Sequence, residues 1–335
     1  MTKEMMKPAL RNILFITALG SAFPALAVDC GRAASIVENT ICNSPQLSWL
    51  DAVMNDANRD ALAGKNSEPV LQRYRNWQES RNACTTTNCL RWAYLQGISA
   101  VYQAPENFNW DGIWWNTSAT NGNGGKIVIS KSSDWAFDFT GEIWGGVYKS
   151  TLRSNVRNYW GLGFTDRIAW GGECTVLFIP QPDGKIVINS DNSGSCKMLM
   201  QDDITLDGVY QRADTDPRPA ATLQTIGVLP SQALDDRFRQ LAGQDYQKYV
   251  AVANNVLYAE DQDDFGATVL TLSVKGAASR NAAMVMYTPS GKIWAMLVTP
   301  DKSKENGINI SYITTEQGEK TPPKTLNNWR ALFLN

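Results

Sequence analysis

Histidine is missing from all 335 residues of the sequence, and this absence restricts the chemistry that the protein can perform. A Ser-His-Asp triad and a Cys-His pair are excluded, and the commonest general acid and base of enzymes is lacking. Zinc sites usually combine cysteine with histidine, so zinc is disfavoured as well. We therefore expect neither a metal nor a cofactor. We also expect the protein not to be an enzyme, because only carboxylates would remain for acid and base chemistry.

An excess of positive charge is also lacking. The chain has 31 lysines and arginines against 33 aspartates and glutamates, which gives a net charge of −2. No basic stripe suggests binding to nucleic acid. A mild acidic excess would instead favour encounter with a cationic partner.

Long apolar runs are absent from the sequence after its first residues. Basic residues up to Arg11, the apolar run Ile13–Phe23 and the small residues ending at Ala27 are typical of a signal peptide over residues 1–27. The run is about half as long as the roughly 20 residues of a spanning helix. We expect no membrane span, cleavage near Ala27, and a mature protein in the periplasm or secreted.

Six cysteines are present, and an even number in an exported chain is more typical of disulfides than of metal binding. Pairing in sequence order is favoured: Cys30–Cys42, Cys84–Cys89 and Cys174–Cys196. The first four cysteines alone allow three connectivities, and sequence does not choose between them. Cys84 and Cys89 enclose a polar loop, TTTN, which suits a staple between helices better than a redox pair.

Helical periodicity dominates the first part of the mature chain, residues 28–103. Apolar residues recur at intervals of three and four over 45–62, 69–82 and 90–101. We predict three amphipathic helices that two disulfides staple into a small domain.

The same segment resembles the family of LprI N-terminal-like domains. The resemblance rests on DC at 29–30, VENTIC at 37–42, PxLxxLD at 45–51, WxxxRNxC at 77–84 and CLxxAY at 89–94. It implies a small helical domain of exported bacterial proteins whose founding members are linked to lysozyme inhibition. Gly97 departs from the pattern, since the family usually has a basic residue there.

Strand patterns replace helical ones after Pro105. Candidate strands lie at 127–129, 135–139, 143–148, 159–164, 174–179 and 186–188, separated by glycine-rich turns. Residues 104–215 are predicted to form an antiparallel β-meander, closed into a small barrel or a sandwich. Its tryptophans either fill the β core or line a ligand cavity.

The last part, residues 216–335, follows a stretch with linker composition, Asp214–Pro219. A helix is expected over 231–241 with Ser231 as its cap. Strands are expected over 249–258, 267–274, 282–287, 292–298 and 308–313. The pattern predicts one helix packed on an antiparallel sheet, so the whole chain is a multidomain α+β protein.

Residues 222–335 resemble the inhibitor of vertebrate lysozyme known as Ivy. The resemblance rests on residues 234–243, YxxYV at 246–250 and RNAAMVMYTPSGKIWAMLV at 280–298. It implies an Ivy-like fold and allows a homodimer. In Ivy a disulfide-closed loop with a histidine enters the lysozyme cleft. The loop here, Ser273–Asn281, has neither residue, so the resemblance implies the fold but not the plug.

The loop before the RNAAMV segment is the candidate inhibitory element. Lys275, Ser279, Arg280 and Asn281 combine cations with small or polar side chains. Such a loop suits a carbohydrate cleft lined by the two carboxyl groups of a glycosidase. The alternative is an ordinary exposed hairpin loop. The acidic run Glu260–Asp264 lacks the spacing of a calcium loop and is predicted to be a solvated turn.

These patterns favour a periplasmic inhibitor, or an immunity protein, that occludes the cleft of a lysozyme or other muramidase-type peptidoglycan hydrolase. The alternative is an envelope binding module whose tryptophan-rich β domain holds a small apolar molecule or a glycan. Sequence does not identify the target hydrolase or the domain that binds it.

Overall fold

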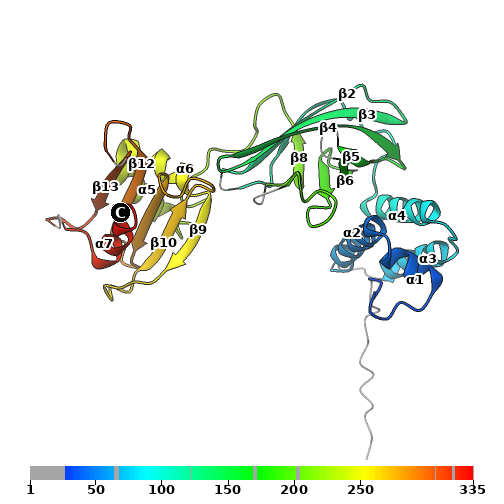
Figure 1. Ribbon diagram of the computed structural model, residues 1–335, viewed down its shortest axis with the longest axis horizontal. Helices are drawn as coiled ribbons and strands as arrows, with labels where there is room; N and C mark the ends of the chain where they lie inside the picture. The colour runs from blue at the N-terminus through cyan, green and yellow to red at the C-terminus, as the bar shows by residue number, and fades with distance from the viewer. Residues whose placement is uncertain are drawn as a thin grey trace, which may run out of the picture.

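A computed structural model describes residues 27–63, 68–120, 122–168, 172–200, 204–305, 307–318 and 321–334 of the chain. The predicted signal peptide lies outside the described residues except for Ala27. Three regions follow one another in the order expected: helices, a barrel, and a second sheet with helices (Figure 1).

Four helices form the first region: α1 (Ile36–Cys42), α2 (Pro45–Leu62), α3 (Glu68–Asn82) and α4 (Thr87–Tyr102). The last three agree with the predicted helices, and α2 has the predicted bounds. Side-chain caps explain where they begin, because Ser44 accepts from the Leu47 amide and Thr86 accepts from the Cys89 amide. Helix α1 was not predicted, although Ser35 and Glu38 form a capping box at its start.

The three disulfides pair in sequence order, as favoured: Cys30–Cys42, Cys84–Cys89 and Cys174–Cys196. The motif RNACTTTNC is therefore a staple. Its disulfide closes the short turn between α3 and α4, at the point where Thr86 caps α4. Disulfides of this kind are typical of an oxidising compartment outside the cytoplasm.

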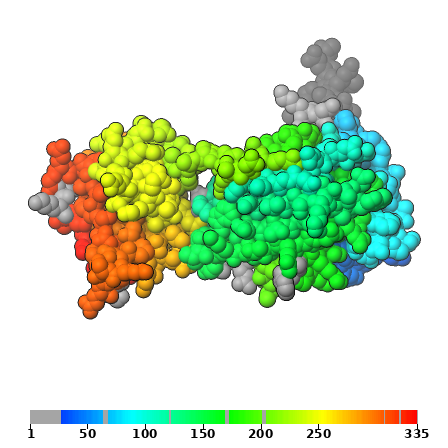
Figure 2. All heavy atoms as spheres, turned by 90° about the horizontal axis from the view of Figure 1, so that it is seen from above, coloured from blue at the N-terminus to red at the C-terminus, as the bar shows by residue number. Residues whose placement is uncertain are grey.

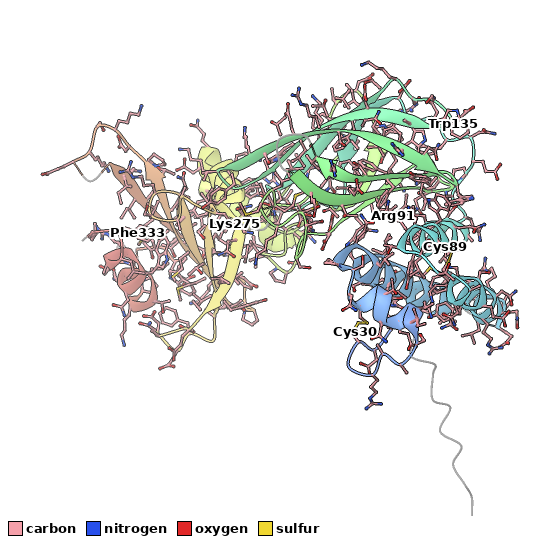
Figure 3. The ribbon with its side chains drawn as sticks, turned by 45° about the vertical axis from the view of Figure 1, so that its right-hand side comes forward. Cys30, Cys89, Arg91, Trp135, Lys275 and Phe333 are labelled. Carbon is pink, nitrogen blue, oxygen red and sulfur yellow. A yellow bond between two sulfur atoms is a disulfide. The ribbon has the colours of Figure 1, made fainter. Side chains whose placement is uncertain are left out.

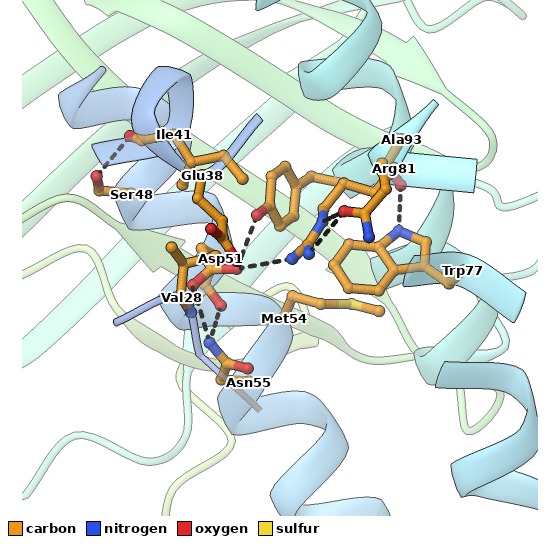
Figure 4. A network of polar contacts seen from close by, with 12 residues as sticks. Val28, Glu38, Ile41, Ser48, Asp51, Met54, Asn55, Trp77, Arg81 and Ala93 are labelled. Carbon is orange, nitrogen blue, oxygen red and sulfur yellow. Dashed lines mark hydrogen bonds and ion pairs between the residues drawn. The ribbon is translucent and has the colours of Figure 1, made fainter. Parts of the chain in front are cut away.

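A buried carboxylate connects the helices to one another (Figure 4). Asp51 on α2 accepts a hydrogen bond of 2.7 Å from the Tyr94 hydroxyl and one of 2.9 Å from the Val28 amide. The Arg81 guanidinium lies 3.8 Å from the same carboxylate and above the ring of Trp77. Asp51 and Arg81 are each only 5% exposed. Burial, followed by the Asp51 charge, raises the pKa of Tyr94, so its hydroxyl stays protonated and donates.

Eight antiparallel strands form a closed barrel in sequence order. They are β1 (Gly112–Asn116), β2 (Gly124–Ser130), β3 (Ala136–Gly145), β4 (Tyr148–Tyr159), β5 (Leu162–Ile168), β6 (Gly172–Pro180), β7 (Ile186–Ser190) and β8 (Gly208–Arg212). The structure thus selects the barrel over the sandwich. Buried aromatic side chains fill the interior; they include Trp114, Phe137, Phe139, Phe178 and Tyr210.

Two predicted strands of this region are wrong because each spans a turn. The segment 143–148 contains the end of β3 and the start of β4, and 159–164 contains the β4–β5 turn. Strands β1, β4 and β8 were not predicted. Strand β4 buries only Leu152 and Val156, so its apolar alternation is weak.

The outer wall of the barrel packs against the helices. On β5 and β6, alternate side chains point outward into the same hydrophobic cluster as α1, α2 and α4; these are Leu162, Phe164, Leu177 and Ile179. The inward neighbours Val176 and Phe178 belong to the barrel interior. Strand β6 is therefore apolar on both faces.

The last region is a five-stranded antiparallel sheet in the order β13-β12-β11-β10-β9. Its strands are β9 (Asn255–Ala259), β10 (Thr268–Ser273), β11 (Ala282–Tyr287), β12 (Ile293–Pro300) and β13 (Ile308–Thr314). Helices α5 (Gln232–Ala242) and α6 (Tyr246–Val252) contribute to the core on one face, and α7 (Lys324–Ala331) covers the other.

The prediction of a single helix packed on this sheet is wrong, because the described residues form three α-helices, α5, α6 and α7. Helix α5 agrees with the prediction, and Ser231 caps it. The predicted strand over 249–258 begins too early, because Tyr246, Tyr249 and Val252 lie at helical spacing and bury one face of α6. Helix α7 was missed although Leu326 and Trp329 have the same kind of spacing.

Among the described residues, no helix has the length and hydropathy needed to span a bilayer.

The substitution Asp51→Asn is expected to lower the free energy of unfolding by about 3 kcal/mol, because it leaves the buried Arg81 without its carboxylate. Urea unfolding measures this loss. Asp56→Asn is the matched control on α2, since the Asp56–Arg59 ion pair is exposed and contributes less than about 1 kcal/mol. Equal losses for the two variants would contradict a central role for Asp51.

The loss in the free energy of unfolding on removing a disulfide should increase with the length of the loop that the disulfide closes. The Cys174–Cys196 disulfide joins residues separated by 22 positions in the sequence, whereas Cys84–Cys89 joins residues separated by 5. Each pair is replaced by alanine in turn. In the chain-entropy description the first pair contributes about 3 kcal/mol and the second about 2 kcal/mol. Denaturant unfolding without reductant compares them. A larger loss for the short loop would indicate that native packing, not loop closure, dominates.

Candidate functional site

The candidate inhibitory loop connects β10 to β11 and is ordered by its own backbone. The amide of Val274 donates to the Asn281 carbonyl at 3.0 Å, which closes the base of the loop. Within it, the amides of Arg280 and Asn281 donate to the Ala277 carbonyl at 3.1 and 2.9 Å. Consecutive turns therefore fix the loop before any partner binds.

The four predicted residues do not share one environment. Ser279 and Arg280 are exposed at the tip, whereas Lys275 and Asn281 are half-buried at the base. The Arg280 guanidinium lies beside Gly307 in the β12–β13 connection. A β-carbon added to Gly307 would lie 3.9 Å from the guanidinium. The structure thus brings Ser279 and Arg280 together on the exposed part of the loop, with the Arg280 guanidinium beside the β12–β13 connection.

Lys275 instead takes part in the contact between the sheet and the barrel (Figure 3). Its carbonyl accepts from the Val147 amide of the β3–β4 turn at 3.2 Å, and its amide donates to Asn254 Oδ1 at 3.1 Å. The Asn254 amide group in turn donates to Asn123 Oδ1 of the barrel at 2.9 Å. Gly276, with φ +75°, lies against Val147. The base of the loop therefore belongs to the contact between the C-terminal sheet and the barrel.

Sequence reasoning missed Asn254, Asn123 and the β3–β4 turn as neighbours of the loop. The signal that existed was the glycine pair Gly145-Gly146, because an added β-carbon at Gly146 would come within 2.6 Å of the Lys275 carbonyl. Such glycines can mark a close backbone approach.

The stretch with linker composition is held against the barrel. The Arg218 guanidinium donates to the carbonyls of Ala119 and Asn123 at 3.0 and 2.9 Å, and it pairs with Asp216 at 2.7 Å. Hydrogen bonding from Arg218 holds the pKa of Asp216 below its usual value. Figure 2 shows the residues after β8 crossing the junction between the green barrel and the yellow and orange sheet region.

The acidic run Glu260–Asp264 has a structural role. Asp263 accepts from the amides of Lys324 and Thr325 at 2.8 Å each, so it caps α7 from a distant part of the chain. Burial opposes ionisation, but these bonds and that from the Thr325 hydroxyl outweigh it and lower the pKa of Asp263. No group of three potential ligands for a metal occurs among the described residues. Asp202 and Asp203, which the sequence likewise predicts to lie in a solvated turn, are outside the described residues.

The barrel interior is packed by its aromatic side chains. Trp110 stacks on Phe137 with ring centroids 4.5 Å apart, and Phe137 meets Phe178 edge to face at 5.6 Å. Trp110 and Trp114 therefore fill the core, as one of the two readings of the tryptophans predicted. Trp135 and Trp160, at one end of the barrel, are exposed instead.

Comparison of the chain with known protein families, with curated proteins and with solved structures found no match. The two resemblances described above thus remain predictions, and the function has to be inferred from the geometry.

Asp263→Ala is expected to lower the free energy of unfolding by about 1 kcal/mol at pH 6 through loss of the α7 cap. Because the pKa of Asp263 is lowered in the folded state, its contribution is complete above the unfolded value of about 3.9 and is lost as the pH falls through the folded value. The difference between wild type and variant should therefore shrink below about pH 4.

Urea unfolding at several pH values measures this difference. Glu260→Ala is the control, since Glu260 is exposed in the same run and should change stability little. A loss for Asp263→Ala that stays constant down to pH 2 would contradict capping by the ionised carboxylate.

Proposed function

We propose that the protein is an extracytoplasmic inhibitor, or immunity protein, of a muramidase-type peptidoglycan hydrolase and performs no chemistry itself. The observation that carries the proposal is the ordered β10–β11 loop, on which Ser279 and Arg280 are exposed. The three disulfides agree with a site of action in an oxidising compartment.

The shape of the tip suits entry into a cleft. Ala277 and Ala278 precede Ser279 and Arg280, so the tip carries one long side chain among short ones. Its backbone bonds are formed within the loop, so binding would cost little further ordering. An ordered loop with one long exposed side chain is therefore well prepared for a concave partner.

Charge supports the same partner. A muramidase cleft holds a carboxylic acid and a carboxylate on either side of the scissile bond. A guanidinium presents paired donors that match a carboxylate in a bidentate way, and it stays charged at all physiological pH values. Arg280 is thus the residue proposed to occupy the catalytic position of the target.

The contact surface would extend onto the barrel. Val147 of the β3–β4 turn is 54% exposed and lies against Gly276 at the base of the loop. A hydrolase that receives the tip would cover this apolar side chain as well. The role of Lys275 is accordingly to hold the loop against the barrel.

We extend the proposal to the two flanking regions. Helices α1–α4 would be an LprI-like module, and the C-terminal sheet an Ivy-like module, in line with the motifs they carry. Each module could bind a hydrolase, and the Ivy-like module could also pair in a homodimer.

Arg280→Ala is expected to weaken inhibition about 30-fold or more, as for a residue at the centre of an interface. The assay titrates the full mature chain against a panel of lysozymes and envelope muramidases and measures residual hydrolysis of peptidoglycan. Arg330→Ala is the control, because Arg330 is exposed on α7 of the same region. Full activity of every enzyme at large molar excess of the wild-type chain would refute the proposed function.

A second candidate function is an envelope module that binds a glycan. It is favoured by the exposed tryptophans at the other end of the barrel.

A further inference from the structure

A cleft of about 600 Å³ opens at the end of the barrel away from Lys275. Figure 3 labels Trp135 at this end. Three segments form the walls: residues 106–110 before β1, the β2–β3 turn over 132–135, and the β4–β5 turn at 158–161. The cavity has the size of an ordinary small-molecule site, about 300 to 1,000 Å³.

Trp160 occupies a position that its backbone disfavours. It forms a two-residue hairpin turn with Gly161, and φ is +51° at Trp160 and +81° at Gly161. Asparagine and glycine are preferred in such turns, and a bulky residue in the left-handed region costs about 1 to 2 kcal/mol. The Ser99 hydroxyl of α4 donates to the Trp160 carbonyl at 2.6 Å and holds the turn in place. The indole is nevertheless 44% exposed, so core packing does not explain this tryptophan.

Trp135 presents a second indole on a fixed backbone. Its side chain is 80% exposed. Its carbonyl accepts from the Asn158 amide at 2.8 Å, which joins the β2–β3 turn to the end of β4. The amide of Ser132 donates to Asp111 Oδ1 at 3.1 Å and joins the same turn to the segment before β1. The three walls of the cleft are thus connected by hydrogen bonds.

The floor of the cleft is rigid. Trp110 is buried and stacks on Phe137, and Phe108 stacks on Trp114 with centroids 5.7 Å apart. The Arg212 guanidinium donates to the Asn109 carbonyl and lies over the Trp114 ring. A ligand would therefore bind on a preformed surface.

The polar lining indicates the charge of the ligand. Glu106, Asp134, Asn107 and Asn158 line the cleft, and none of the described residues that line it is a lysine or an arginine. Two carboxylates disfavour an anionic ligand such as a phosphate or a nucleic acid. Asparagine amides both donate and accept, which suits hydroxyl and acetamido groups.

We infer that this cleft binds a neutral glycan chain, with the apolar faces of pyranose rings stacked on Trp135 and Trp160. Indoles offer a large flat apolar surface, and the amides and carboxylates between them bond the equatorial polar groups of the sugar. The ligand class is an oligosaccharide of pyranoses whose equatorial polar groups leave the ring faces apolar. The inference rests on the second candidate function and gives its site and ligand class; it does not depend on the proposed inhibition, because it uses none of the residues of the β10–β11 loop.

Calorimetric titration of the full mature chain tests this inference, with the tetramer of N-acetylglucosamine and cellotetraose as separate probes and tryptophan fluorescence as a second readout. Binding of either probe is expected, and the two probes distinguish an acetamido requirement from stacking alone. Trp135→Ala and Trp160→Gly should each weaken binding at least tenfold. Trp160→Gly should leave the thermal midpoint unchanged or higher, because glycine tolerates the positive φ.

Trp92→Ala is the matched control, since Trp92 on α4 is 53% exposed and does not line the cleft. It should bind the probes as the wild type does, and so should Arg280→Ala. Absence of binding at millimolar concentrations of both probes would overturn the inference. Unchanged affinity in both cleft variants, or an equal loss in Trp92→Ala, would do the same. Failure of muramidase inhibition would leave it standing, so the two proposals fail separately.

Discussion

Burial of both faces of β5 and β6 is the constraint on which the rest of the molecule depends. Inward side chains of these strands complete the barrel interior, and outward ones complete the core of the helical region. The helical region spans only about 75 residues, and domains of that size are marginal without further support. The barrel wall and the disulfides supply that support. The helical region and the barrel therefore share one hydrophobic interior.

The barrel also separates two surfaces of different character. Strand β3 runs from the exposed Trp135 to the turn at Gly146 that meets Lys275, a distance of about 30 Å for ten extended residues. One end is aromatic and acidic, and the other adjoins a tip with an exposed arginine. A single small ligand cannot reach both ends. The packed interior between them keeps the two proposed binding surfaces apart.

Local sequence patterns were sufficient to predict an element where its apolar face has a clear periodicity. The helix Pro45–Leu62 agrees with prediction because its apolar spacing determines it. The disulfides pair in the sequential order that was favoured among the possible connectivities. Strand β4 was missed because its outward side is polar and its inward side includes serines. Trp160 was read as part of a strand, since a tryptophan at positive φ contradicts turn preferences. The contact of Lys275 with the barrel depends on a backbone approach over more than 120 residues, which no local pattern encodes.

The junction between barrel and sheet consists of a few polar contacts, chiefly Lys275 with Val147 and Asn254 with Asn123. Two separate proteins would not stay together through such contacts. Here the strap over residues 213–222, anchored by Arg218, makes the association intramolecular. Short tethers give effective concentrations in the millimolar range, so a weak contact is populated without high affinity. Separation of the two parts would break these contacts without opening either core, because each part has its own hydrophobic cluster. A partner that needs more room at the loop would therefore compete only with contacts this weak.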